Sequence, residues 1–370
     1  MKTMKIREAL KKILVSPNGC SREPIFETYD KNVQGNTVWE RGKVAASVIT
    51  PFRDFPELSD KSSKTGVAIA NGGNPNLAKV SARIAAENAV VEAVVKVSCV
   101  GGVPLALTDC LNFGNPEKKE QMGEFVAGVE GVKLACEALE IPVVSGNVSF
   151  YNESSGTSIP PSALVSVFAR VDDPTKVPEL DFKKEGETVF LVGARSEHLG
   201  GSALMEIANK KDTRIPEVDF KSTKKWLGRL QQVASLNLIS SAYPIGLGGV
   251  LVALAKSSFE NEIGVDIRME NDPFDKLRAG EWRMTRSTSS GQANRKGENM
   301  VSFLFSEDAG VIISTSFPEK VQEIFGGDAL EIGKTTKEFN LKIEHKTESV
   351  LNQELGALKE LYQQGLREVF

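Results

Sequence analysis

Two polar segments, each following an apolar stretch, carry side chains that could bind a nucleotide or a metal ion. The first spans residues 107–116 (LTDCLNFGNP) and brings Thr108 and Asp109 to the end of an apolar strand. A carboxylate at the carboxyl end of a strand can bind Mg²⁺ or accept hydrogen bonds from a ribose or an adenine. Spacing alone leaves a second interpretation equally open, in which Asp109 only caps the loop.

The second polar segment spans residues 143–152 (VVSGNVSFYN). Gly146 would let the backbone approach a phosphate, because glycine has no Cβ. Asn147 offers a neutral oxygen to a hard cation, and Ser149 offers a hydroxyl to an anionic substrate. On pattern alone, a β-turn rich in Asn and Ser is the more common structure for such a segment.

Other segments give weaker signals. The LGGS at 199–202 could present backbone amides to a phosphate at a helix start, but a turn is the favoured interpretation. Residues 327–335 (GDALEIGKT) resemble a P-loop, but Asp328 stands where that loop needs a glycine, which excludes it. The two histidines, His198 and His345, lie in polar stretches without partner motifs. We therefore predict no catalytic residue.

Helices and strands predicted from hydrophobic periodicity position the two polar segments in one domain. Ser81 can cap a helix over 81–100, which Gly101 and Gly102 would end, and a second helix covers 120–139. The predicted strands are 66–70, 105–107, 141–144 and 163–169. Each polar segment follows one of these strands.

The whole chain is predicted to be α+β, because helices and strands alternate without strict βαβ regularity. Its 370 residues are too many for one ordinary domain. The segment 271–297 reads as an insertion, since it is polar, basic and long; a nucleic-acid patch is less favoured because the segment has few aromatic residues. The predicted divisions are 1–22, a helix and turn; 23–172, the first domain; 173–345, the second; and 346–370, a C-terminal helix.

Composition excludes several classes of protein. The net charge of −4 gives no basic field for nucleic acid or for a membrane surface. No stretch approaches the ~18 apolar residues of a membrane span. The four cysteines form neither a CxxC pair nor a zinc-site spacing, which favours free thiols and a cytoplasmic location.

Five segments together resemble the second half of phosphoribosylformylglycinamidine synthase, in order and in spacing. The resemblance runs from about residue 16 to residue 370, apart from 271–297, and LTDCLNFGNPEK and SGNVSFYN are its most specific parts. The segments are TYDKNVQGNTV (28–38), CVGGVPLALTDCLNFGNPEK (99–118), CEALEIPVVSGNVSFYNE (136–153), EHLGGS (197–202) and ELGALKELYQQGLREVF (354–370).

The resemblance implies an aminoimidazole-ribonucleotide-synthetase-like N-terminal domain, whose sheet pairs with a sister domain, followed by a C-terminal α/β domain. It also implies an ATP-dependent C–N ligase of purine biosynthesis. In that reaction ATP phosphorylates the amide oxygen of formylglycinamide ribonucleotide, and ammonia then displaces phosphate to give the amidine.

By the same resemblance, ATP contacts fall on Asp109 and Gly146, a Mg²⁺ ligand on Asn147 and a substrate contact on Ser149. The implied cofactors are ATP and Mg²⁺. The implied partners are an N-terminal-half chain, which completes the site, and a glutaminase subunit, which supplies ammonia. The family's catalytic histidines have no counterpart, and its magnesium-binding loop reads SAYPIGLGG at 241–249, without a carboxylate.

Three hypotheses follow. The favoured one is a C-terminal-half subunit that needs an N-terminal-half partner for activity. Because the chain begins with its own Met1 where the second half begins, we expect either a separately encoded subunit or a truncated product. The second is a catalytically incomplete nucleotide-binding or scaffold module of the same complex. The third, a self-contained homodimeric synthetase, is disfavoured because the magnesium-binding loop has no acidic residue.

Overall fold

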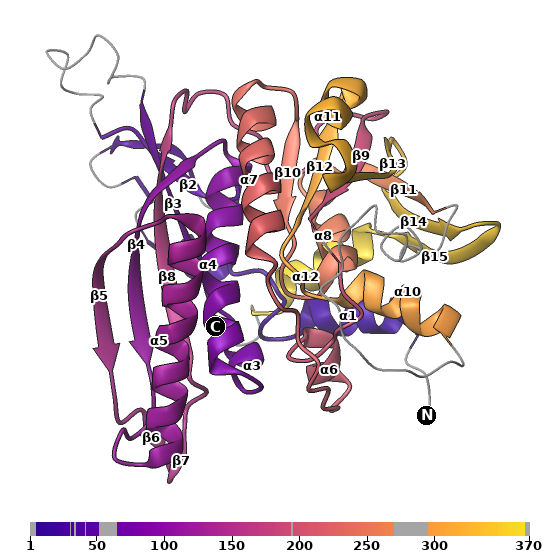
Figure 1. Cartoon of the computed structure of the whole chain (residues 1–370). Coiled ribbons are helices and arrows are strands. Elements are labelled where there is room, and N and C mark those ends of the chain that lie inside the picture. The colour runs from indigo at the N-terminus through magenta and orange to yellow at the C-terminus, as the bar shows by residue number, and fades with distance from the viewer. Residues whose placement is uncertain are drawn as a thin grey trace, which may run out of the picture.

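Two β-sheets with helices between and beside them make up this computed structural model (Figure 1). The structure describes residues 5–29, 31–32, 35–40, 42–51, 65–193, 195–269 and 295–366, and side chains of 295–299 are not part of the description. The predicted insertion lies outside the described residues up to 294, and its last three residues begin helix α10 (Arg295–Phe305). Residues 30, 33 and 34 of the segment 28–38 also lie outside them.

The first sheet has six strands, and its outer edge is β5 (Figure 1). Neighbouring strands are antiparallel, except that β4 and β5 are parallel. In spatial order the strands are β1 (Thr37–Trp39), β2 (Ser47–Ile49), β3 (Gly66–Gly72), β8 (Ser162–Val171), β4 (Val103–Asn112) and β5 (Val143–Ser149). A separate hairpin joins β6 (Glu153–Ser154) to β7 (Thr157–Ser158).

Helices cover one face of the first sheet. They are α3 (Pro75–Ala78), α4 (Ala82–Cys99) and α5 (Lys119–Leu139). The predicted cap of α4 is confirmed, because the Ser81 hydroxyl accepts a hydrogen bond from Ile84 N at 3.3 Å. Gly101, at φ +74°, follows the last turn of α4 in a conformation that favours glycine.

The opposite face of the first sheet is open in the part of the chain that the structure describes. Along β8, Val165 and Val167 are buried toward the helices, as alternate positions on a strand require. The intervening Leu164 points to the other face and is 42% exposed. One side of this sheet therefore faces α4 and α5, and the other presents side chains to the outside.

The second sheet has seven strands, antiparallel except for the pair β11–β14. Their order is β10 (Ser241–Pro244), β12 (Val311–Thr315), β9 (Thr188–Val192), β13 (Ala329–Thr336), β11 (Gly264–Met269), β14 (Asn340–His345) and β15 (Glu348–Glu354). The remaining helices are α1 (Ile6–Val15), α2 (Glu23–Phe26), α6 (Ala203–Ile207), α7 (Phe220–Ser235), α8 (Gly249–Ser257), α11 (Pro318–Phe325) and α12 (Gly356–Gln364), with a 3₁₀ turn at Gly326–Asp328.

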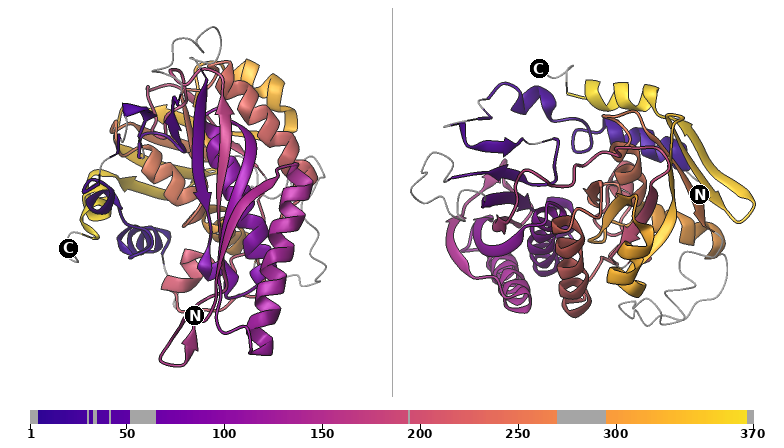
Figure 2. Two further views of the ribbon diagram at one scale, coloured as in Figure 1. Left: turned by 90° about the vertical axis from the view of Figure 1, so that its left-hand side faces the viewer. Right: turned by 90° about the horizontal axis from the view of Figure 1, so that it is seen from above.

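One apolar cluster joins the two sheets. It includes residues of α4 and β8 together with Leu230 of α7, Phe190 of β9 and Val311 of β12. A second apolar cluster fills the side of the second sheet that faces away from the first sheet, beneath α1, α8 and α12. Figure 2 shows α1 and α12 side by side, so the two ends of the described chain pack on the same unit. No helix within the described residues is long and apolar enough to cross a membrane.

The predicted C-terminal helix over 346–370 is wrong in its first third. Residues 348–354 form β15, which pairs with β14, and of this segment's described residues, which end at 366, only Gly356–Gln364 are helical. Leu351 and Gln353 are buried while Asn352 is exposed, which is the alternation of a strand. The backbone partners offered by β14 outweigh the helical spacing of the apolar residues in this segment.

Candidate functional site

The two polar segments lie on neighbouring parallel strands. Asp109 of β4 pairs with Gly146 of β5, and Asn112 pairs with Ser149. The predicted strand end is wrong, because β4 continues to Asn112, and the β-turn interpretation is wrong for residues 143–149, which form β5. Backbone pairing with β8 on one side and β5 on the other keeps this part of β4 extended.

The Asp109 carboxylate lies directly against the backbone of Gly146. A Cβ added to Gly146 would lie 2.5 Å from Asp109 Oδ1 and 2.8 Å from Oδ2. Burial raises the pKa of Asp109, and a hydrogen bond from the backbone N–H of Asn147 opposes this. Gly146 therefore has a structural reason to be glycine, which is to let this carboxylate rest against the strand.

The four predicted site residues divide between the two faces of the sheet. Asp109 pairs with the buried Val165, so it points toward α5. The positions of Asn147 and Ser149 pair with Cys110 and Asn112, which alternate with Asp109 and so face the open side. A ligand that contacts all four residues must pass around the exposed edge of β5.

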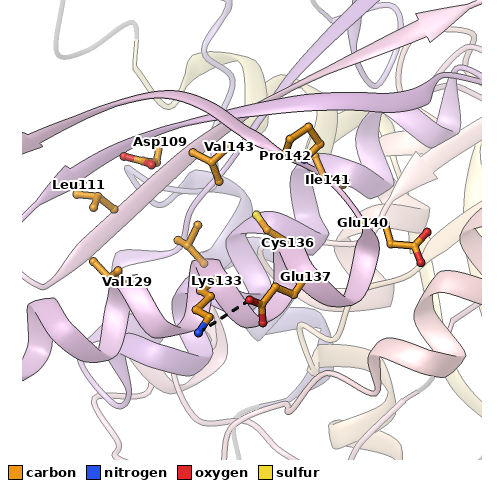
Figure 3. Close-up of a pocket in the computed structure, with 11 residues that line it drawn as sticks. Asp109, Leu111, Val129, Lys133, Cys136, Glu137, Glu140, Ile141, Pro142 and Val143 are labelled. Carbon is orange, nitrogen blue, oxygen red and sulfur yellow. Dashed lines mark ion pairs between the residues drawn. The ribbon is translucent and has the colours of Figure 1, made fainter.

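A cavity of about 640 Å³ lies between β4, β5 and α5 (Figure 3). Asp109 lines it from the sheet, and the ion pair of Lys133 with Glu137, at 3.9 Å, lies on α5. Such a cavity, mostly apolar with one half-buried carboxylate, suits a flat ring that carries a hydrogen-bond donor. The other lining residues are Leu111, Val129, Val132, Cys136, Glu140, Ile141, Pro142 and Val143.

No group in the cavity is set up as a nucleophile. Burial raises the pKa of the Cys136 thiol to about 11, and the charge of Asp109 adds to this effect. The thiol therefore stays protonated at neutral pH, whereas a reactive cysteine needs a lowered pKa.

The weaker candidates have structural roles. The backbone N–H of Ala203, which follows the LGGS turn, donates to Glu307 Oε1 at 2.8 Å. Lys334 and Thr335 of the P-loop-like segment lie within strand β13. His198 is half-buried, and its Nδ1 lies 3.0 Å from the carbonyl oxygen of Ile215, so a backbone contact holds this ring.

The chain offers an incomplete set of ligands for Mg²⁺ around Asn147. Mg²⁺ prefers six oxygen ligands, usually including a carboxylate. Asp109 pairs with Gly146, the residue before Asn147, but its carboxylate points to the opposite face of the sheet from Asn147. Among the described residues, no group of three or more His, Cys, Asp or Glu side chains could hold a metal ion. These residues do not form a magnesium site by themselves.

Comparison with known protein families matches both parts of the chain. The AIR synthase related protein N-terminal domain matches residues 60–171, and the corresponding C-terminal domain matches residues 184–346. The chain belongs to the AIR synthase related family. The first range holds β3, β8, β4 and β5 of the first sheet, and the second holds every strand of the second sheet except β15, in agreement with the predicted α+β fold.

Within this family, the chain is similar to subunit PurL of phosphoribosylformylglycinamidine synthase. It is 33% identical to that subunit from Carboxydothermus hydrogenoformans over 97% of the chain and 46% of the relative. It is also 33% identical to the subunit from Thermomicrobium roseum, over 98% of the chain and 46% of the relative. The chain thus spans about half the length of these curated relatives.

Solved structures show the same fold. Thermotoga maritima PurL complexed with FGAR superposes with a TM-score of 0.70 at 14% identity, over 95% of this chain and 53% of that one. Thiamine-monophosphate kinase from Stenotrophomonas maltophilia superposes with a TM-score of 0.53 at 12% identity, over 77% of this chain and 87% of that one.

Proposed function

We propose that this chain is the C-terminal half of a phosphoribosylformylglycinamidine synthase. It would contribute Asp109, Gly146, Asn147 and Ser149 to an active site that an N-terminal-half chain completes. Support comes from the similarity to PurL over nearly the whole chain and about half of the relative. A glutaminase subunit would supply ammonia, and a cytoplasmic location fits the four free cysteines of the described chain.

The observation that carries the proposal is the cavity between α5 and β5, with the Asp109 carboxylate fitted against Gly146. Its apolar walls would hold the adenine of ATP, and Asp109 would accept a hydrogen bond from the adenine amino group or a ribose hydroxyl. From there the triphosphate would pass the exposed edge of β5 to the open face. Asn147 would there supply one of several Mg²⁺ ligands, the others coming from the nucleotide and the partner chain.

The chemistry consists of two transfers. The γ-phosphoryl group of ATP passes to the amide oxygen of formylglycinamide ribonucleotide, and ammonia then displaces that phosphate to form the amidine. Such reactions depend mainly on positioning and on stabilising negative charge. On the open face, Ser149 would donate a hydrogen bond to an anionic oxygen of the substrate, and bound Mg²⁺ would offset the charge of the phosphates.

Phosphate release by the purified chain tests this proposal. The chain is given formylglycinamide ribonucleotide, Mg·ATP and ammonium, with and without an N-terminal-half protein. We expect release only when both chains are present. Release by the chain alone would contradict the split site, and no release from either mixture would contradict the enzymatic role.

A scaffold role is the second candidate, and one observation favours it. The N–H of Gly248, in the loop where the family carries its magnesium aspartate, donates to the Glu307 carboxylate at 2.7 Å. In this chain the loop therefore binds a carboxylate of the protein and has no carboxylate of its own to offer to Mg²⁺. Asp109→Ala and Asn147→Ala separate the two candidates: an active site needs both residues, whereas a scaffold would keep the assembled activity within about twofold.

A further inference from the structure

The Ser149 hydroxyl is held by one neighbouring side chain, that of Asn152. The amide Nδ2 of Asn152 donates to Ser149 Oγ at 3.1 Å and to the Ser149 carbonyl at 2.9 Å. It also donates to the carbonyl of Phe113 at 3.0 Å, so the two hydrogens of this amide are shared among three acceptors. Two backbone carbonyls as acceptors fix which end of the amide is the nitrogen.

Backbone hydrogen bonds hold Asn152 itself in place. Its N–H donates to the Phe113 carbonyl at 3.2 Å, and its carbonyl accepts from Ile159 N at 3.0 Å. Tyr151, just before it, has a φ of +59° and donates its N–H to the Gly114 carbonyl at 3.0 Å. The amide therefore stands on a turn that is tied to the end of β4 and to the β6–β7 hairpin.

The amide leaves the hydroxyl hydrogen of Ser149 available. Because Nδ2–H donates to Oγ, one lone pair of the hydroxyl is occupied. The hydrogen can go to Asn152 Oδ1, but that oxygen lies 3.3 Å away, beyond the usual 2.5–3.0 Å of an O–H···O bond. An anionic ligand oxygen would be a stronger acceptor, and a hydroxyl that accepts one hydrogen bond is a better donor of another.

We propose that Asn152 is a positioning residue, which holds the Ser149 hydroxyl so that its hydrogen points to an anionic oxygen of the substrate. This inference rests on the proposed function, in which Ser149 contacts formylglycinamide ribonucleotide. Asn152 acts through Ser149 and touches no reacting atom.

A double-mutant cycle in the assembled two-chain enzyme tests the inference. Asn152→Asp keeps the shape of the side chain but replaces the Nδ2 donor with an oxygen, which would draw the Ser149 hydrogen away from the substrate. We expect Ser149→Ala and Asn152→Asp each to raise the KM for the ribonucleotide about tenfold, as loss of one hydrogen bond to a charged group would. The double variant should match Ser149→Ala within about twofold, and the KM for ATP should not change.

Different results identify different failures. If the two substitutions multiply, or if Asn152→Asp raises both KM values equally, Asn152 acts independently of Ser149 and the inference is wrong. A wild-type KM in Ser149→Ala would overturn the inference together with the substrate contact of Ser149, while partner-dependent activity would still support the split enzyme. Absence of activity in the unsubstituted complex would instead be the failure of the proposed function.

Controls address folding. Asn261→Asp removes the same kind of donor bond, from Nδ2 to the Phe182 carbonyl at 2.9 Å, in the other unit of the molecule, and should leave both KM values unchanged. If Asn152→Asp does not fold, Asn152→Ala replaces it. We then expect a smaller rise in the ribonucleotide KM, which must vanish in the Ser149→Ala background; a rise that persists there would overturn the inference.

Discussion

At the residue scale, the lack of a side chain at Gly146 leaves room for the Asp109 carboxylate, which lines the cavity. Gly146→Ala would place a methyl group 2.5 Å from Asp109 Oδ1, so either the carboxylate or the strand must move. We expect the KM for ATP of the assembled enzyme to rise at least tenfold. The free energy of unfolding should fall by about 1–3 kcal/mol, the usual cost of overpacking.

Gly123→Ala is the matched control for this substitution. Gly123 lies in α5, and a Cβ there would meet nothing within 4 Å. Alanine in a helix interior is more stable than glycine by about 0.5–1 kcal/mol, so this variant should be slightly more stable with an unchanged KM. An unchanged KM for ATP in Gly146→Ala would show that the nucleotide does not depend on the position of Asp109.

At the same scale, the sequence suggested candidate site residues but not the directions in which their side chains point. The types of Asp109, Asn147 and Ser149 already indicated nucleotide, cation and anion contacts. That Asp109 faces α5 while the other two face outward depends on strand register, because side chains alternate along a strand. Register follows from pairing with β8 and β5, which no local pattern reveals.

At the scale of elements, Glu307 joins the starts of two helices. Its Oε1 accepts from Ala203 N at the start of α6 and from Gly248 N just before α8. Burial raises the pKa of Glu307 to about 7, and the charge of Glu92 adds to this, whereas the two N–H donors and the side chain of Asn74 oppose it. These contacts span 104 and 59 residues of sequence, so no local signal predicts them.

The raised pKa of Glu307 predicts a pH dependence of stability. In the unfolded chain the pKa lies near 4.5, so the folded state holds the proton more tightly, and stability falls as pH rises from about 4.5 to about 7. Glu307→Gln keeps the accepting oxygen and removes the charge. We expect the variant to match the wild type near pH 4.5 and to exceed it by about 1–3 kcal/mol at pH 8, measured by urea unfolding.

Comparison with a surface glutamate isolates this effect. Asp181, whose pKa burial also raises to about 7, is present in both proteins and cancels in the difference. Glu323→Gln, which makes the same substitution at an exposed position on α11, is the control variant. Parallel pH profiles for the wild type and Glu307→Gln would mean that the Glu307 carboxylate is not the titrating group.

At the scale of the whole molecule, local signals predicted the elements better than their assembly. The Ser81 cap and apolar spacing predicted α4, and apolar spacing predicted α5, because these signals lie within the sequence of each helix. They failed over 348–354, where β14 supplies the backbone partners. The shared apolar cluster of the two sheets was also invisible to them, since it joins β8 and α4 to the distant Phe190 and Val311.

This shared cluster predicts that the two matched domains unfold together. Leu230 of α7 is fully buried in it, so Leu230→Ala should lower the free energy of unfolding by about 2–5 kcal/mol. Because α7 packs on α4, the loss should also increase amide hydrogen exchange in α4, within the first domain. Leu236, which follows the last residue of α7, is 55% exposed, so Leu236→Ala should lower the free energy of unfolding by less than about 0.5 kcal/mol.

Tryptophan fluorescence and far-UV circular dichroism should report one urea transition in the wild type and in both variants. Two separate transitions, with α4 exchange unchanged in Leu230→Ala, would instead mean that each domain is stable without the other and that the cluster contributes little to either.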